Sequence, residues 1–302
     1  MIPKKFKDFA HTNNGLNARP CFIKEVAESL EELLKEDFIF KKNLIEDYKS
    51  IFINYLNSDP YNKLEGLKEF SFGTYTHGTI QAFEDFYSRH SNKRLRWFEG
   101  DFAYHQIASR SYGFCGEIIN DLDDLKFGDS FVISVPFSAS CKVNDQIEEI
   151  LNICEKESIP VLLDFAYLPI SRNIKINLNY ETIDSICFSL SKCYFGIERL
   201  RTGLRLRRDY KDDPTDFFNE FSMFNHAGAY VGMNLLMQYP PSDIVNMLAP
   251  IYERLCKENN YEMNNTVLFS SLNKTHHEYE FYKRGNSVYS RKCLSEMIAE
   301  LI

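Results

Sequence analysis

Between residues 94 and 190 short apolar runs alternate with helical stretches, and this alternation constrains the fold more than any other feature. The runs are bounded by Gly, Pro or Asp, as buried strands are. An amphipathic helix, DQIEEILNICEKE, separates the second run from the third. Buried strands that alternate with helices indicate a parallel α/β sheet. The four runs are RLRWFEG, SFVISVP, IPVLLDFAY and SICFSL.

The segments on either side of this region extend the pattern. Helical spacing predicts helices over Cys21–Lys35, over about 43–56 and after a Gly-Thr turn at 78–79. Residues 213–257 are helical in pattern, with a break at Pro240-Pro241, and the last segment predicts two short strands and a helix. We expect a three-layer α/β/α large domain with a mostly parallel sheet over 41–245. Residues 1–40, an N-terminal arm, and 246–302, a reduced C-terminal domain, would form a small α+β cap.

Charge and composition exclude several classes of protein. The 35 Lys and Arg against 43 Asp and Glu leave a formal charge of −8, so a nucleic-acid partner is not expected. No apolar run reaches the roughly 18 residues of a membrane span. The basic start of the chain is not followed by the apolar core of a signal peptide. Eight scattered cysteines without a C-x-x-C pair indicate reduced thiols in a cytoplasmic protein, with no metal site.

The stretch Pro160-Val-Leu-Leu-Asp164-Phe-Ala-Tyr167 is the first candidate for chemistry. Its strand ends in an aspartate, and in open α/β sheets ligands lie at the carboxyl ends of the strands. On this stretch alone, a helix-capping Asp and a core Tyr are an equally good interpretation.

The second candidate stretch contains Lys192 directly after a buried apolar run. Ser189 and Ser191 flank this lysine, and Arg199 and Arg201-Thr-Gly203 follow it. Lysines at strand ends are usually just exposed, but hydroxyls and an Arg-x-Gly beside this one are not typical of a solvated surface. The further arginines of this run, Arg205, Arg207 and Arg208, are interpreted as an exposed strand edge.

Taken in order, D-x-A-Y, S-x-S-K and R-x-G resemble the fold-type I enzymes that use pyridoxal phosphate (PLP), most closely the class I/II aminotransferases. Gly100-Asp-Phe102-Ala-Tyr-His105 and Gly78-Thr79-Ile80 match further family segments loosely. The chain resembles a short, divergent member, with most of the missing length in the cap. The resemblance covers about residues 10 to 300.

The resemblance implies roles around the cofactor ring. Lys192 would form the Schiff base with PLP and later act as general base. Asp164 would pair with the pyridine nitrogen, and His105 would contact Asp164 on the side away from the ring. Tyr167 would hydrogen-bond the ring hydroxyl oxygen, and Phe102 would stack on the ring.

A phosphate site and a substrate site are implied in the same way. The phosphate would take backbone N–H groups at a helix start and an arginine, either Arg201, which Thr-Gly favours, or Arg199. Ser138 stands where the family has an asparagine that hydrogen-bonds the ring hydroxyl. Substrate contacts would come from Asn14, Gly15 and Arg291. The guanidinium of Arg291 would bind the α-carboxylate in a bidentate way. The other phosphate ligands would be Gly78, Thr79, Ile80 and Ser189.

The resemblance implies an aminotransferase that uses a small amino donor and a keto acceptor and forms a homodimer. A PLP-dependent lyase or decarboxylase would use the same residues. A non-catalytic binding or regulatory protein that retains the fold is a further alternative, because the family's N-P-x-N-P-T-G segment is replaced by Val135-Pro136-Phe137-Ser138-Ala139-Ser140-Cys141.

Overall fold

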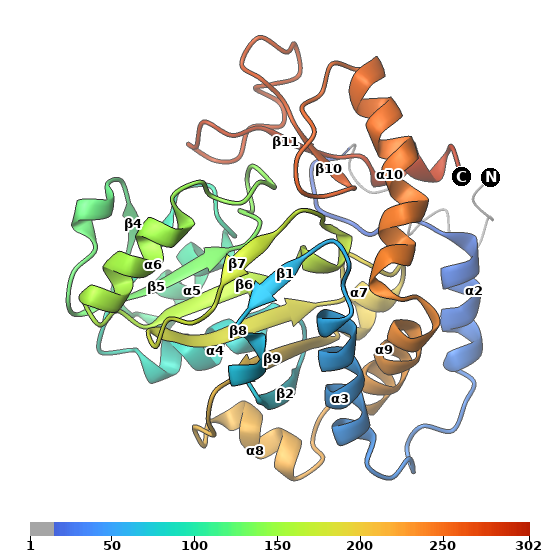
Figure 1. Cartoon of the computed structure of the whole chain (residues 1–302), viewed down its shortest axis with the longest axis horizontal. Coiled ribbons are helices and arrows are strands. Elements are labelled where there is room, and N and C mark those ends of the chain that lie inside the picture. Colours follow the sequence, from blue (N-terminus) through green and yellow to red (C-terminus); the bar gives the residue numbers. More distant parts are fainter. Residues whose placement is uncertain (1–14) are drawn as a thin grey trace.

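A seven-stranded sheet forms the centre of the protein in the computed structural model, which describes residues 15–302 (Figure 1). The strand order is β2-β9-β8-β6-β5-β3-β4, and β9 alone runs against the other six. The mostly parallel sheet is therefore confirmed. Its strands are β2 (Phe72–Thr76), β3 (Arg94–Phe98), β4 (Gly116–Ile119), β5 (Asp129–Ser134), β6 (Val161–Phe165), β8 (Ile183–Ser189) and β9 (Gly203–Arg207).

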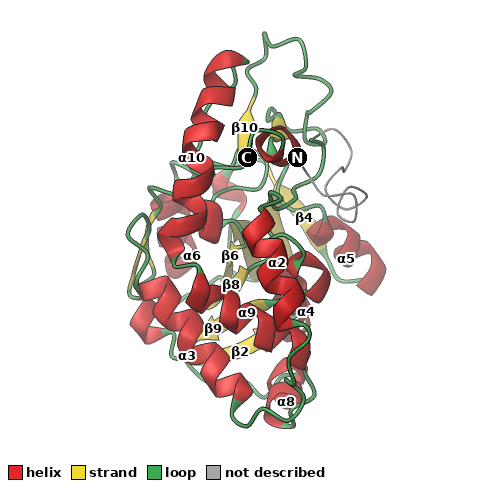
Figure 2. Cartoon of the chain, turned by 90° about the vertical axis from the view of Figure 1, so that its right-hand side faces the viewer, coloured by secondary structure: helices red, strands yellow, loops and turns green. Residues whose placement is uncertain are grey.

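Helices cover both faces of this sheet, which confirms the three-layer α/β/α architecture (Figure 2). The break at Pro240-Pro241 separates α9 from α10, as predicted, and a second break precedes α9. The helices are α2 (Lys24–Leu33), α3 (Leu44–Asn57), α4 (Thr79–Arg89), α5 (Tyr104–Tyr112), α6 (Ile147–Lys156), α7 (Ile197–Leu200), α8 (Pro214–Glu220), α9 (His226–Gln238), α10 (Pro241–Glu258) and α11 (Ser295–Ala299). Short 3-10 turns occur at η1 (Leu67–Glu69), η2 (Leu122–Asp124) and η3 (Leu168–Ile170).

Alternate residues of the central strands pack on opposite faces of the sheet. In β6, Leu162 joins the cluster formed with α4 and α5, whereas Val161 and Leu163 join the larger cluster on the other face. Both faces are thus buried, which explains why these strands read as continuous apolar runs in the sequence.

Two small strand pairs lie outside the central sheet. β1 (Lys63–Glu65) pairs in parallel with β7 (Lys175–Asn177), and β10 (Phe269–Ser271) pairs antiparallel with β11 (Arg291–Cys293). The start of the described chain joins the second pair, because the Cys293 N–H donates to the Gly15 carbonyl at 2.8 Å. The start of the described chain and its C-terminal segment therefore meet in a small cap, as predicted; the domain bounds at 40 and 245 stay a prediction.

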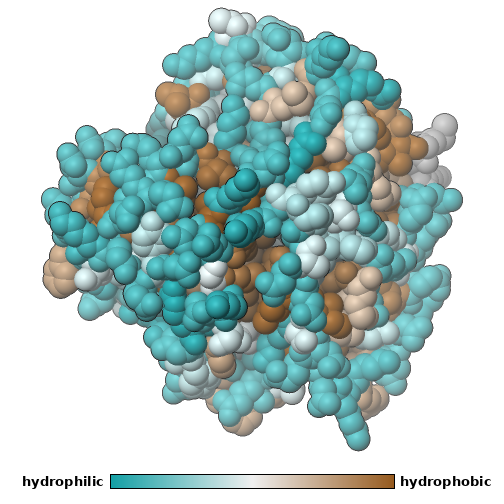
Figure 3. Space-filling view, in the orientation of Figure 1, coloured by the Kyte–Doolittle hydropathy of each residue, from teal (hydrophilic) through white to brown (hydrophobic). Residues whose placement is uncertain are grey.

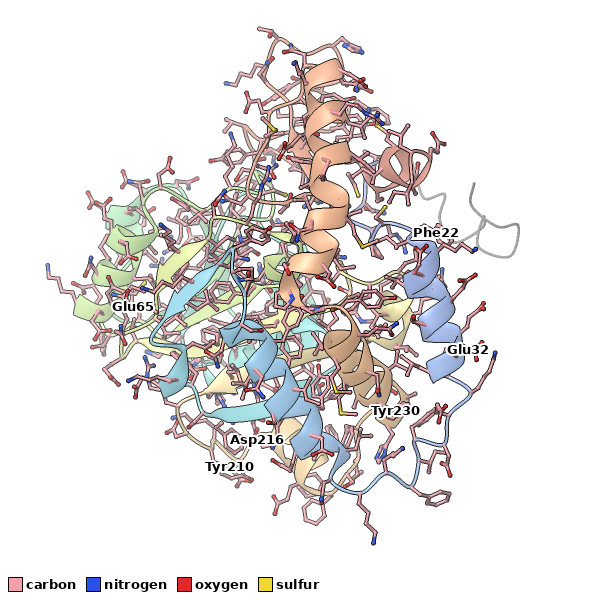
Figure 4. All side chains as sticks on the ribbon, turned by 45° about the vertical axis from the view of Figure 1, so that its right-hand side comes forward. Phe22, Glu32, Glu65, Tyr210, Asp216 and Tyr230 are labelled. Carbon is pink, nitrogen blue, oxygen red and sulfur yellow. The ribbon has the colours of Figure 1, made fainter. Side chains whose placement is uncertain are left out.

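The prediction of an exposed edge at Arg205 and Arg207 is wrong. Both side chains are fully buried, because β9 lies inside the sheet between β2 and β8. Arg205 donates to Asp85 at 2.5 Å, to Asp213 at 2.8 and 3.0 Å and to Asp216 at 2.5 Å; Asp216 is labelled in Figure 4. Helices α4 and α8 and the N-cap of α8 supply these carboxylates, so the arginine charges are paired inside the protein.

Arg208, the third arginine of that predicted edge, is also partly buried. Its guanidinium donates to the carbonyl oxygens of Leu178, Tyr180 and Ile183 at 2.7–2.9 Å. These bonds tie the end of β9 to the segment that leads into β8.

The surface shown in Figure 3 is largely hydrophilic, with apolar side chains in scattered groups. Within residues 15–302, no helix is both long and apolar enough to cross a membrane. The eight cysteines are all free thiols, and Cys115 is the exposed one. No metal-binding group of His, Cys, Asp and Glu side chains occurs among the described residues.

Candidate active site

Most of the predicted site residues line one pocket of about 350 Å³ at an edge of the sheet. The strands β2, β5, β6 and β8 all end at this edge, and β9, which runs the other way, begins there. This common edge explains how residues more than 100 positions apart, such as Thr79 and Arg201, come together. The predicted residues that line the pocket are Thr79, Ile80, Phe102, Ser138, Asp164, Tyr167, Ser189, Lys192, Arg201 and Arg291.

Lys192 enters the pocket from the turn after β8. Its Nζ donates to the Ala18 carbonyl at 3.2 Å, so the N-terminal segment holds it in place. Burial, and next the positive charge of Arg291, lower the pKa of Lys192 to about 8. An appreciable fraction of this amine is therefore uncharged near neutral pH and can act as a nucleophile or base.

Asp164 is the buried carboxylate of the pocket. It accepts the Ala166 N–H at 2.9 Å, and none of the ion pairs among the described residues includes it. Burial, and next the charge of Asp101, raise the pKa of Asp164 to about 7. The charge of Lys192 acts against this rise only weakly, so a cation that enters the pocket beside Asp164 would pair with it and favour its ionised form.

Asp101 is a second buried carboxylate close behind this site, and the sequence analysis missed it. Ser134 donates to it through its N–H at 3.1 Å and its hydroxyl at 2.5 Å, and Phe102 donates its N–H at 2.8 Å. Burial raises the pKa of Asp101 to about 6. Ser134 is also the register partner of Asp164 across β5 and β6, so the two acids flank one strand end.

Arg291 and Tyr167 form the wall on the cap side. Arg291, on β11, donates through Nη1 to the Tyr167 hydroxyl at 2.7 Å and to the Ser138 carbonyl at 2.5 Å. Arg291 is 2% exposed, and its Nε has no hydrogen-bond partner among the described residues. The guanidinium thus still has donor capacity beside the pocket.

The opposite end of the pocket has the donors of an anion site. Gly78, at φ +70°, precedes α4, whose first N–H groups receive no side-chain cap. Arg201 donates from Nη2 to the His77 carbonyl at 3.3 Å, and this nitrogen lies 3.2 Å from where a Cβ on Gly78 would be. The hydroxyl of Ser189, at the end of β8, lines the same end. Helix N–H groups, a hydroxyl and a guanidinium suit a phosphate dianion.

Of the two arginines considered for this anion site, Arg201 lines the pocket. Arg199 is exposed and lies 4.0 Å from Glu198, outside the lining. This difference follows from α7, which ends at Leu200 and leaves Arg201 in a left-handed conformation at φ +54°.

Phe102 lines the pocket just before α5, whereas His105, in the first turn of α5, packs against Phe83 of α4 and does not line the pocket. Phe102 is 37% exposed and lies 6.1 Å from the Phe83 ring. Burial lowers the pKa of His105 to about 3, and its Nδ1 lies 2.6 Å from the Tyr87 hydroxyl. Its Nε2 is buried without a partner in the part of the chain described, so its role toward Asp164 stays a prediction.

Gly15 does not line the pocket, and Asn14 lies outside the described residues. At φ +81°, a Cβ on Gly15 would lie 2.8 Å from the Cys293 carbonyl. The glycine is therefore explained by its close approach to β11. Instead, the next residues Asn17, Ala18 and Arg19 reach the pocket.

Further lining residues gave no sequence signal. Arg19, Glu198 and Arg284 lie in irregular segments or a short helix, where charged residues are usually solvated. Only their place in the fold reveals them, since no local pattern distinguishes them from surface charges.

No protein-family model matches this sequence, and no curated protein matches it in sequence. Solved structures match it over nearly the whole chain. A PLP-bound protein from Clostridium difficile 630 is 15% identical, with a TM-score of 0.70 over 98% of this chain and 92% of that one. A PLP-bound C-S lyase from Staphylococcus hominis is 11% identical, with a TM-score of 0.68 over 94% of this chain and 88% of that one. An aromatic aminotransferase from Pyrococcus horikoshii OT3 is 14% identical, with a TM-score of 0.65 over 94% of this chain and 92% of that one.

At these identities the similarity is one of fold. The chain therefore shares the α/β fold of these three solved structures, and segments near both ends of the described chain form a small cap.

Proposed function

We propose that the protein is a PLP-dependent enzyme that acts on the amino group of an amino acid or amine, with Lys192 as its Schiff-base lysine and transamination as its reaction. One observation carries the proposal. A half-buried lysine with a lowered pKa and a buried carboxyl group that forms no ion pair among the described residues share a pocket that also has the donors of an anion site.

The residues of the pocket fit each part of this cofactor. When bound, PLP supplies an aldehyde that condenses with amines and a ring that withdraws electrons from the bond being broken. Asp164 would hold the proton on the pyridine nitrogen, and a cation there would lower its raised pKa. Phe102 would lie against the ring.

The anion site would hold the phosphate group. The uncapped N–H groups at Thr79 and Ile80, the hydroxyl of Ser189 and the guanidinium of Arg201 supply its donors. Gly78 leaves room for Arg201 to lie close above it, because any Cβ there would fill that space.

At the other end, Tyr167 would donate to the ring hydroxyl oxygen. Ser138 takes the place of the family's asparagine, and its carbonyl already anchors Arg291. Arg291 would orient the substrate by its α-carboxylate. The Lys192 amine could take a proton from the substrate Cα and return it elsewhere, because its pKa of about 8 is close to neutral pH.

A PLP-dependent lyase is the second candidate function. Its support is the fold similarity to the Staphylococcus hominis C-S lyase. The two functions differ in whether turnover needs a keto acid to accept the amino group. Product release from an amino acid without any keto acid would favour the lyase.

Absorbance and reduction test the proposal. With PLP added, the purified protein should show an absorbance band that borohydride removes, and mass spectrometry should place the reduced cofactor on Lys192. Lys192→Ala should lose the reducible band. Lys142→Ala is a matched control, since Lys142 pairs with Glu262 at 3.3 Å outside this pocket. No band in the wild-type protein, or a reducible band in Lys192→Ala, would refute the proposal and leave the non-catalytic alternative.

We also propose that the enzyme is a cytoplasmic homodimer that takes a small amino donor and a keto acceptor. The open side of the pocket supports a dimer, because Phe102 and Arg201 line it and are both exposed in a single chain. Light scattering of the purified protein tests this assembly.

A further inference from the structure

Asp101 is a buried carboxylate that the proposed function does not use. It is 8% exposed, and none of the ion pairs among the described residues includes it. Its hydrogen-bond donors are neutral: the N–H and hydroxyl of Ser134 and the N–H of Phe102. Other buried aspartates, such as Asp129 and Asp216, pair with arginines. Burying a carboxylate without a cation is costly, so Asp101 needs another explanation.

Asp101 lies behind the pocket, beside Asp164. Ser134 connects the two acids, because it donates twice to Asp101 and is the register partner of Asp164 across β5 and β6. Ser134 and Asp164 line the pocket, whereas Asp101 does not. After burial, the charge of Asp101 is the next cause that raises the pKa of Asp164. The two carboxyl groups are therefore close enough to repel each other when both are ionised.

The groups around the two acids are neutral, apart from Lys192, in the part of the chain that the structure describes. Burial lowers the pKa of His105 to about 3 and raises the pKa of the Tyr87 hydroxyl well above its ordinary value. The Cys187 thiol donates to Asp164 at 3.8 Å. The charge of Lys192 affects the pKa of Asp164 less than burial does. A cation that enters the pocket would therefore be the main counter-charge of the acid pair.

We propose that Asp101 is a positioning residue of the proposed cofactor site, where its carboxylate adds a second negative charge behind Asp164 and makes the site select a cofactor whose ring nitrogen carries a proton. The inference rests on the proposed function. Asp164 would contact the ring nitrogen, and Asp101 would act through Asp164, because it does not line the pocket. A protonated ring withdraws electrons more strongly, so the acid pair would serve the reaction without touching the reacting atoms.

Hydrogen bonding alone is a simpler explanation of Asp101, because its bonds tie the segment before α5 to the end of β5. Two ligands separate the explanations. PLP and its deaza analogue share the aldehyde, the phosphate and the shape, but the analogue has a C–H group in place of the ring nitrogen. A charge effect changes the affinity for PLP alone, whereas a structural effect changes both affinities.

Fluorescence titration should show that the wild type binds PLP more tightly than the analogue. Asp101→Asn and Asp101→Ser should each weaken PLP binding roughly tenfold, the effect of one charge about 10 Å away at an effective dielectric constant of about 20. Both variants should bind the analogue as the wild type does. The two variants check each other, because asparagine turns an NH₂ group toward the donors of Ser134, whereas serine is smaller and leaves a hydroxyl acceptor.

Asp59→Asn is the matched control. Asp59 also accepts three hydrogen bonds from neutral donors, the N–H of Tyr61 at 2.8 Å and the N–H and side-chain amide of Asn62 at 3.2 and 2.8 Å. Burial raises its pKa too, but it does not line the pocket. This variant should bind both ligands as the wild type does.

A double substitution tests whether Asp101 acts through Asp164. Asp101→Asn should weaken PLP binding by a smaller factor in the Asp164→Asn protein than in the wild type. An equal factor in the two proteins would overturn the inference.

Equal losses of affinity for PLP and for the analogue in the Asp101 variants would also overturn the inference, because the role of Asp101 would then be structural. Equal binding of the two ligands by the wild type, or an unchanged PLP affinity in the variants, would overturn it as well. In each of these cases the proposed function stands, as long as the wild type forms the reducible band with PLP. If the wild type does not bind PLP, the proposed function and the inference both fail.

Discussion

Replacing Asp164 by asparagine should stabilise the cofactor-free protein while removing the proposed contact of Asp164 with the cofactor ring. The introduced amide would keep an oxygen for the Ala166 N–H, which now donates at 2.9 Å, but could not ionise. In the wild type, burial and then Asp101 raise the pKa of Asp164 from 3.8 to about 7. Ionising this carboxyl inside the folded protein therefore costs free energy, and the variant avoids that cost.

The size of the effect follows from the pKa and depends on pH. Each pKa unit is worth about 1.4 kcal/mol, so the full cost is about 4 kcal/mol. The unfolded chain releases this proton near pH 4 and the folded protein near pH 7, so the wild type loses stability as pH rises between these values. The variant should be more stable by about 2 kcal/mol near pH 5 and by about 4 kcal/mol above pH 7.

Urea unfolding of the cofactor-free proteins at several pH values measures this difference. Asp184→Asn is the matched control with the opposite sign. Burial acts to raise the pKa of Asp184, but hydrogen bonding by His90 and the charge of Arg89 hold it well below its ordinary value. Asp184→Asn should therefore destabilise the protein by a similar amount at pH 5 and pH 8, because it leaves Arg89 with one partner fewer.

The reasoning would be refuted if the stability difference between Asp164→Asn and the wild type did not change between about pH 5 and about pH 8. It would also be refuted if Asp164→Asn lost as much free energy of unfolding as Asp184→Asn does. Adding PLP should reverse the order of stability, since the ring cation supplies the counter-ion that Asp164 lacks. Ligand-induced stabilisation of the wild type but not of Asp164→Asn is the expected result.

Three other substitutions have defined outcomes. Arg205→Met leaves three buried carboxylates short of a cation and should lower the free energy of unfolding by about 3–5 kcal/mol at neutral pH, measured by urea unfolding. Gly203→Ala places a Cβ 2.6 Å from the Phe188 carbonyl oxygen and 2.9 Å from the Gly78 Cα. It should therefore distort the anion site and lower both the stability of the protein and its affinity for PLP, which fluorescence titration measures. An unchanged stability and affinity would contradict the close packing. Arg201→Gln should weaken PLP binding about tenfold or more without moving the unfolding midpoint of the cofactor-free protein, and equal loss in Arg199→Gln would show that the assignment is wrong.

The central site was predictable because its residues follow buried strands. Asp164 and Lys192 each stand at the end of an apolar run, and parallel strands end at one edge of a sheet. The local sequence was therefore enough to predict both the fold and the position of these two side chains. The choice of Arg201 over Arg199 also depended on a local signal, the Thr-Gly that leads into β9.

Other parts of the site depend on long-range contacts that no local pattern reveals. Arg205 looked like a surface residue because its partners Asp85 and Asp216 come from helices on other parts of the chain. Arg284 is a charge in a short hairpin, and only the position of that hairpin over the pocket distinguishes it from a solvated residue. Asp101 is hidden for the same reason, since its contacts with Ser134 are made across the sheet.

The meeting of the two chain ends sets an order of events in folding. The sheet from β2 to β9 is complete by residue 207, yet the pocket needs Ala18 from the start of the chain and Arg291 from its end. Closing this loop of more than 270 residues costs entropy before any contact of the pocket forms. On the ribosome, Lys192 would thus emerge and fold long before its surroundings exist. The pocket should therefore form only after Arg291 has been synthesised, and binding of the proposed cofactor would be a late step that holds these two segments together.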